Sequence, residues 1–189
     1  MTLDPFLAEF IGTAFLLLLG AGVVANVNLK QTIAENQNPW MLITTAWAFA
    51  VFVGVFISSQ SSGAHLNPAV TLGLAVAGKF SWELVGSYLL AQLLGAMCGS
   101  FLAYLAYIDH YRATQDEAAV KSTFCTGPAI RNYKSNLFAE ALGAFVLVFT
   151  ALMIASPNID IEGSSVLILA LALLTHCLLR WLYGSLVLL

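Results

Sequence analysis

The sequence predicts an all-α membrane protein with about five transmembrane helices and one shorter helix that enters the bilayer without crossing it. Of the 189 residues, 60% are hydrophobic and only 9% are charged, and the mean hydropathy is +0.87. A soluble domain carries roughly a quarter charged residues, so a chain this apolar is expected in a lipid bilayer. Several runs reach the length of about 20 apolar residues that a transmembrane helix needs, and one further run is half as long.

The expected transmembrane helices are long runs with at most one charged residue each. They cover residues 5–25, 40–60, 84–107, 136–157 and 163–179. The first run follows no Lys or Arg and lacks a small-residue cleavage site, so we expect a retained helix and not a signal peptide. In the third run, Gly95 and Gly99 form a small face that lets another helix approach closely. The polar stretch 108–135 is expected to be a solvated loop.

The connection between the second and third runs is apolar in its second half and predicts a half-helix. Residues 68–78 would rise about 16 Å as a helix, half of the hydrocarbon thickness of roughly 30 Å. Asn67 is a favourable N-cap and Pro68 suits the first helical position. The carbonyl groups of residues 63–66, in non-helical backbone at membrane depth, would form a row of acceptors. A broken helix of this kind indicates a path for a solute or an ion.

An internal repeat divides the expected single transmembrane domain, residues 1–189, into two parts. The pattern Ala-Glu-x-x-Gly begins at Ala8 in the first run and again at Ala139 in the fourth, an offset of 131 residues. An odd number of spans precedes the second copy, which inverts its topology. We expect a first repeat at 1–107 and a partial second repeat at 136–189. The offset puts a second half-helix near position 198, so that half-helix and a sixth span are missing from these residues.

Together these motifs resemble the major intrinsic protein family of aquaporins and glycerol facilitators. The resemblance rests on Ser-Gly-Ala-His-Leu-Asn-Pro-Ala-Val-Thr at 62–71, on the repeated Ala-Glu-x-x-Gly, and on Ala-Gln-x-x-Gly-Ala at 91–96. It implies an aquaporin-like inverted-repeat bundle whose pore is formed where two Asn-Pro-Ala half-helices meet. The pore residues that it implies here are one such motif, the four residues before it and one aromatic filter residue: Asn67, Pro68, Ala69, Gly63, Ala64, His65, Leu66 and Trp47.

Trp47 determines which solute the resemblance favours. It lies twenty positions before Asn67 and matches a filter position that is Trp in many glycerol facilitators, which favours glycerol. A broad indole face suits the carbon skeleton of a polyol, while carbonyl and amide groups opposite take its hydroxyls. The alternative interpretation of Trp47 is a lipid-facing or packing aromatic. His65 is expected to anchor the loop by hydrogen bonding, in preference to acting as a general base.

Three polar residues of the expected spans are interpreted as buried structural groups: Glu9, Glu140 and Gln92. A carboxyl group is costly at membrane depth and therefore needs a function or a partner. The resemblance implies that the two glutamates accept hydrogen bonds from re-entrant backbone. The alternative is that Glu9 and Glu140 carry protons in an ion-coupled transporter.

The end of the sequence departs from the family pattern. The second Asn-Pro-Ala, the arginine that follows it and the sixth span do not occur in the 189 residues. Arg180 and His176 are therefore assigned no role in the site. Residues 176–181 can be encoded by codons that, when translated one base later, give a different peptide. That peptide suits the end of a fifth span and the start of a re-entrant loop. We therefore hypothesise a frameshift near Thr175.

The expected function is a passive, cofactor-free channel for glycerol and similar small uncharged solutes, with some water, in the plasma or bacterial inner membrane. The resemblance implies a homotetramer with a pore in each protomer. The alternatives are a non-conducting truncated family member and a proton- or ion-coupled transporter. No nucleophile, metal-ligand set or cofactor motif supports an enzyme, and a net charge of −3 gives no basic field for nucleic acid. Three cysteines without metal-ligand or paired spacing are expected to be packing residues: Cys98, Cys125 and Cys177.

Overall fold

The computed structural model describes residues 3–35, 40–128 and 130–154. In this part of the chain, four helices are long and apolar enough to cross a membrane: α1 (Pro5–Asn28), α2 (Trp40–Ser62), α4 (Trp82–Ala106) and α7 (Tyr133–Ile154). The shorter helices are α3 (Pro68–Val76), α5 (Ile108–Ala113) and α6 (Glu117–Ser122). Four expected spans are thus confirmed, and the fifth, at 163–179, lies outside the described residues, as does the hypothesis of a frameshift near Thr175.

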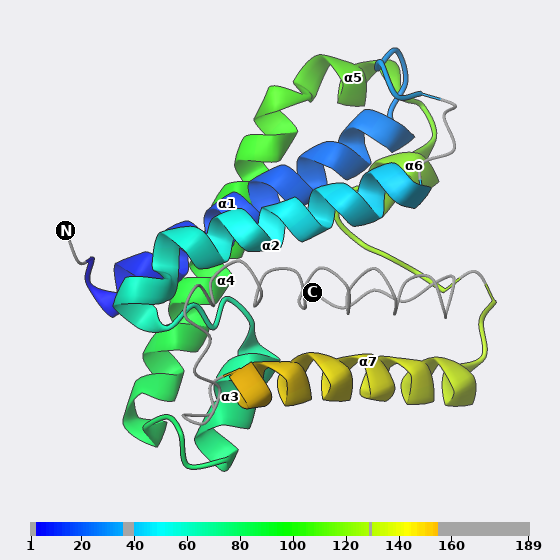
Figure 1. Ribbon diagram of the computed structural model, residues 1–189. Helices are drawn as coiled ribbons and strands as arrows, with labels where there is room; N and C mark the ends of the chain where they lie inside the picture. The colour runs from blue at the N-terminus through cyan, green and yellow to red at the C-terminus, as the bar shows by residue number, and fades with distance from the viewer. Residues whose placement is uncertain (1–2, 36–39, 129, 155–189) are drawn as a thin grey trace.

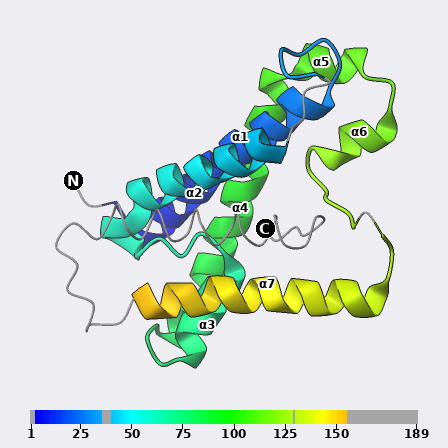
Figure 2. The ribbon, with the colours of Figure 1, turned by 45° about the vertical axis from the view of Figure 1, so that its right-hand side comes forward.

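Helix α1 lies between α2 and α4, and these three helices form a bundle (Figure 1). The short helix α3 packs against α4, and α7 lies beside α3. In the turned view of Figure 2, α7 again runs next to α3 and apart from α1 and α2. The described chain therefore consists of a three-helix bundle with the half-helix and one further span attached at one end.

Helix α1 begins with a defined cap and forms the centre of the bundle. Asp4 Oδ1 accepts a hydrogen bond from the N–H of Phe6 at 3.0 Å, and Pro5 takes the first helical position, where its missing N–H costs nothing. Half of the most apolar stretch of α1 is buried, against 28% for α2 and for α4. Of the four described spans, the first along the chain is therefore the most enclosed.

Glycines of α4 allow it to touch the backbone of α1. A Cβ atom at Gly95 would overlap the carbonyl oxygen of Phe10, and one at Gly99 would overlap that of Ala14. The close-packing face expected in the third span is therefore confirmed. Such backbone approach is how transmembrane helices gain contact energy without a hydrophobic driving force between them.

Helix α2 approaches α1 in a similar way. A Cβ atom at Gly54 would stand 2.9 Å from the carbonyl oxygen of Gly12, and one at Gly12 would stand 2.7 Å from Leu66 Cδ2. The side chain of Leu66 thus occupies the space that the two glycines leave open. This contact brings the chain after α2 back against the centre of the bundle.

The solvated loop expected at 108–135 is wrong in part, because α5 and α6 fold over the end of α1. Tyr111 is 8% exposed and belongs to a small apolar cluster with Ala25 and Leu29. Burial raises the pKa of the Tyr111 phenol, which remains a donor and gives a hydrogen bond to Thr123 Oγ1 at 2.9 Å. The charged side chains of this stretch are exposed, as expected: Asp109, Arg112, Asp116, Glu117, Lys121, Arg131 and Lys134.

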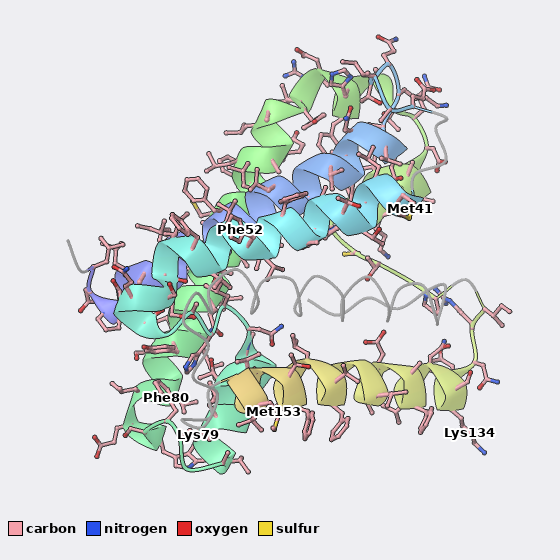
Figure 3. The ribbon with its side chains drawn as sticks, viewed as in Figure 1. Met41, Phe52, Lys79, Phe80, Lys134 and Met153 are labelled. Carbon is pink, nitrogen blue, oxygen red and sulfur yellow. The ribbon has the colours of Figure 1, made fainter. Side chains whose placement is uncertain are left out.

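Helix α7 is held beside α3 by two contacts near its C-terminal end. A Cβ atom at Gly73 of α3 would overlap the side chain of Val148. Lys79 Nζ donates to the carbonyl oxygen of Leu152 at 3.1 Å, where a cation complements the helix dipole. Figure 3 shows Lys79 and Met153 at the same corner of the molecule. Elsewhere α7 exposes large apolar side chains, as a helix in lipid does: Leu137, Phe138, Phe145 and Phe149.

The cysteines differ in their surroundings. Cys98 is half-buried in α4, as a packing residue should be. Cys125 is exposed, because the chain after α6 leaves the apolar cluster, so the packing interpretation is wrong for Cys125. Cys177 lies outside the described residues.

Replacing Gly99 with Ala is expected to lower the thermal midpoint, because the added methyl group overlaps the carbonyl of Ala14. Overpacking of this kind costs about 1–3 kcal/mol. Gly86 in the same helix is the matched control, since a Cβ atom there meets nothing within 4 Å. Gly86→Ala should keep or raise the midpoint, because Ala favours a helix by about 1 kcal/mol over Gly. Circular dichroism melting in detergent micelles measures both, and equal midpoints would contradict the close crossing.

Candidate functional site

The chain between α2 and α3 turns back without helical structure at residues 63–67, which we call the re-entrant turn. Gly63 has a φ of 81°, and Ala64 and Leu66 have φ values of 54° and 51°. This left-handed backbone costs a residue with a side chain about 1–2 kcal/mol. The re-entrant turn therefore keeps its shape only because surrounding groups hold it.

The strongest of these groups is the carboxylate of Glu9 on α1, which is 0% exposed. Its Oε1 accepts from Ser62 Oγ at 2.6 Å and from the N–H of His65 at 2.9 Å. Its Oε2 accepts from the N–H of Leu66 and from Gln92 Nε2, both at 2.8 Å. A carboxylate has about four acceptor positions, so these four donors satisfy it. The group ties α2, the re-entrant turn and α4 to α1.

The peptide N–H groups of the re-entrant turn are directed into the bundle. The N–H of Ala64 donates to Ser62 Oγ at 3.1 Å, and the next two N–H groups along the chain donate to Glu9. In a trans peptide, the preceding carbonyl group is antiparallel to the N–H. The Gly63 carbonyl group consequently points away from Ser62 Oγ, and those of Ala64 and His65 point away from Glu9, so the three are successive acceptors.

The half-helix begins as its sequence predicts. Asn67 has extended backbone, with φ −147° and ψ 130°, and its Oδ1 accepts from the N–H of Ala69 at 2.8 Å. Pro68 occupies the first helical position and is exposed. Because the cap uses the side-chain oxygen, the amide nitrogen of Asn67 is the atom of this side chain that can donate elsewhere. The helix ends at Val76, two residues before the expected end.

A second group of hydrogen bonds centres on Thr71, which is 0% exposed in α3. Its Oγ1 lies 3.0 Å from Gln92 Nε2, 3.1 Å from His65 Nδ1 and 3.2 Å from the carbonyl oxygen of Asn67. The N–H of Thr71 also donates to that carbonyl at 3.1 Å. Thr71 thus joins α4 to the middle of the re-entrant turn, at His65, and to its last residue, Asn67.

Aromatic rings enclose the imidazole of His65, which is 8% exposed. The ring centroids lie 4.6 Å from Phe80 and 4.9 Å from Tyr88, and these two rings are 4.7 Å apart. The Tyr88 hydroxyl donates to the carbonyl oxygen of Ser62 at 3.0 Å. The side chain of His65 is thus packed and hydrogen-bonded, as an anchor of the re-entrant turn requires.

Two residues of the expected site lie away from the re-entrant turn. Trp47 is half-buried in α2 and packs over Gly20 of α1, where a Cβ atom would stand 2.5 Å from two carbons of the indole. Glu140 is half-buried in α7 and takes no part in the hydrogen bonds around Glu9. The structure therefore brings together Glu9, Gln92 and residues 63–69 but not Trp47 or Glu140.

Sequence reasoning missed four residues that hold the re-entrant turn: Ser62, Thr71, Phe80 and Tyr88. Helical spacing contained part of the signal. Thr71 lies four residues after Asn67, and Tyr88 lies four residues before Gln92, so each shares a helix face with a residue already identified. In the described ranges, no three His, Cys, Asp or Glu side chains gather where they could hold a metal ion.

The family model described as "Major intrinsic protein" matches residues 2–185. A "Probable glycerol uptake facilitator protein" of Thermotoga maritima is 48% identical over 83% of this chain and 67% of its own length. "Glycerol uptake facilitator protein 3" of Lactiplantibacillus plantarum is 50% identical over 79% of this chain and 63% of its own length. The solved aquaglyceroporin from Plasmodium falciparum superposes with a TM-score of 0.74 at 29% identity, covering 95% of this chain and 72% of that one. The chain thus spans about two thirds of the length of these curated relatives.

Replacing Glu9 with Gln is expected to destabilise the protein strongly. An amide offers one acceptor oxygen, so its nitrogen would face two of the four present donors. Each buried donor left without a partner costs about 1–3 kcal/mol, or about 2–6 kcal/mol together. Glu83→Gln at the exposed start of α4 is the control and should change stability by about 0.5 kcal/mol or less. Thermal unfolding in micelles compares them, and equal losses would show that Glu9 does not hold the turn.

Proposed function

The chain belongs to the major intrinsic protein family, and from this premise we propose that it provides a passive membrane path for glycerol and other small uncharged solutes, with some water. Residues 63–69 line that path: Gly63, Ala64, His65, Leu66, Asn67, Pro68 and Ala69. The path needs no cofactor, and the protein lies in the cell membrane as a multi-pass protein. The complete assembly is a homotetramer.

One observation carries the proposal: the re-entrant turn directs its N–H groups to Glu9 and Ser62 and its carbonyl groups the other way. Successive carbonyl acceptors followed by the donor amide of Asn67 match a solute whose hydroxyl groups both donate and accept. The carboxylate behind them is surrounded by four donors. The path thus presents neutral dipoles to the solute, which suits an uncharged molecule.

Trp47 supplies the apolar side of the same path in this proposal. One part of the indole rests on Gly20 of α1, and Trp47 as a residue is half-buried. An exposed aromatic face can contact the carbon skeleton of a polyol while polar groups bind its hydroxyls. This arrangement favours glycerol over water as the preferred solute.

The ion-coupled transporter is not favoured, because all four acceptor positions of Glu9 are occupied by fixed donors. A proton on either oxygen of Glu9 would occupy one of these acceptor positions and leave one buried donor without a partner in each cycle. The non-conducting form remains an outcome of the test below, since Asn-Pro-Ala occurs once in the 189 residues. Glu140 is proposed as the corresponding acceptor for the second half of the repeat.

Stopped-flow light scattering of liposomes containing the purified chain tests the proposal. After an osmotic shock with glycerol, we expect reswelling faster than in protein-free liposomes of the same lipid, at a rate that an imposed proton gradient does not change. Dependence on the gradient would support the transporter. Reswelling equal to that of protein-free liposomes would support the non-conducting form.

The substitution Asn67→Asp tests the two roles of the Asn67 side chain separately: its oxygen caps α3, and its amide nitrogen is the proposed donor to the solute. Aspartate caps a helix as well as asparagine does, so the thermal midpoint should stay close to that of the wild type. It cannot donate through its side chain and adds a negative charge, so glycerol flux should be lost. Asn67→Ala, the comparison variant, loses the cap and about 1 kcal/mol of stability. Retained glycerol flux in a folded Asn67→Asp variant would exclude Asn67 as the donor.

A further inference from the structure

Three polar atoms converge on the hydroxyl of Thr71, and their chemistry restricts where its hydrogen can lie. Gln92 Nε2, His65 Nδ1 and the carbonyl oxygen of Asn67 lie within 3.0–3.2 Å of Oγ1. A hydroxyl has one hydrogen and two acceptor lone pairs. Three neighbours therefore use its full capacity, provided that one accepts and two donate.

The orientation of the Gln92 amide shows that Gln92 is one of the two donors to the Thr71 hydroxyl. Its nitrogen lies 2.8 Å from Oε2 of Glu9, and a carboxylate can only accept. The same nitrogen is the atom within 3.0 Å of Thr71 Oγ1, so it donates there as well. This orientation leaves Gln92 Oε1 buried and without a hydrogen-bond partner among the described residues.

The Asn67 carbonyl is the one neighbour that accepts from the Thr71 hydroxyl. It can only accept, so the single hydrogen of the Thr71 hydroxyl is directed to it. One lone pair of Oγ1 is already taken by Gln92. The remaining lone pair faces His65 Nδ1, which must then carry a proton to make a hydrogen bond at 3.1 Å.

We propose that Thr71 is a positioning residue of the re-entrant turn: its hydroxyl links the Glu9–Gln92 pair to the Asn67 carbonyl and holds His65 as the Nδ1–H tautomer. The unprotonated Nε2 then lies at the edge of the ring nearest Gly63, 3.9 Å from the position of a Cβ atom there. In the proposed solute path, this edge of the ring adds an acceptor beside the carbonyl groups of the re-entrant turn. The functional part of the inference rests on the proposed solute path.

The chain offers a matched control for Thr71. Thr13 on α1 is 3% exposed, and its Oγ1 has no hydrogen-bond partner among the described residues. Replacing either threonine with Val deletes the same hydroxyl group from a buried site. Thr13→Val removes an unpaired polar atom and should leave the protein unchanged or more stable, whereas Thr71→Val removes the shared partner of three groups.

The first experiment measures the tautomer directly. The full chain with ¹⁵N-labelled histidine is examined by nuclear magnetic resonance in micelles at mildly alkaline pH, where imidazoles are neutral. His65→Gln identifies the His65 signals. We expect a protonated Nδ1 and a bare Nε2 in the wild type, Thr71→Ser and Thr13→Val, and a mixture of tautomers in Thr71→Val. A protonated Nε2 in the wild type would overturn the assignment.

The second experiment measures glycerol flux of the same proteins in liposomes. Thr71→Val should lower the flux about tenfold, the equivalent of about one lost hydrogen bond, and Thr71→Ser should restore it. Thr13→Val should match the wild type. Unchanged flux in a folded Thr71→Val variant would overturn the positioning role. Absence of flux in the wild type would count against the proposed function alone, because the tautomer measurement needs no transport.

Discussion

A carboxylate without exposed surface joins three helices and a left-handed turn through four hydrogen bonds. Without it, the N–H groups of His65 and Leu66 would lie in the interior without partners, at about 1–3 kcal/mol each. The same bonds hold Leu66 at a positive φ, and Ser62, itself bound to Glu9, holds Ala64. The shape of the re-entrant turn, and the direction of its carbonyl groups, therefore follow from the position of one side chain.

Close helix packing is what brings the donors within reach of Glu9. Gly12 lies three residues after Glu9 and lets α2 approach, and Gly95 lies three residues after Gln92 and lets α4 approach. N–H···O hydrogen bonds in proteins join donor and acceptor atoms about 2.7–3.2 Å apart, so a larger side chain at either crossing would separate Glu9 from its partners. The hydrogen bonds to Glu9 therefore depend on close helix packing on both sides of α1, against α2 and against α4.

The importance of Glu9 and Asn67 could be predicted from the sequence. The hydrogen bonds that connect these two residues could not. A glutamate in an apolar run needs a partner, and Asn67 followed by Pro68 is a recognisable helix start. The role of Thr71 depends on how α3 and α4 are rotated relative to each other, which no local pattern encodes. Trp47 illustrates the same limit: its spacing from Asn67 identifies a position along α2, whereas its contact with Gly20 is set by the neighbouring helix.

The sequence separation of these partners has a consequence for synthesis of the protein. Glu9 leaves the ribosome 53 residues before Ser62 and 83 residues before Gln92. Glu9 lies one turn inside the N-terminal end of α1, and a carboxylate within a membrane helix is costly until it has partners. The four hydrogen bonds to Glu9 can therefore form only after α2, the re-entrant turn and α4 have been synthesised. The carboxylate of Glu9 is thus made first, and its fourth partner, Gln92, becomes available only when α4 has been synthesised.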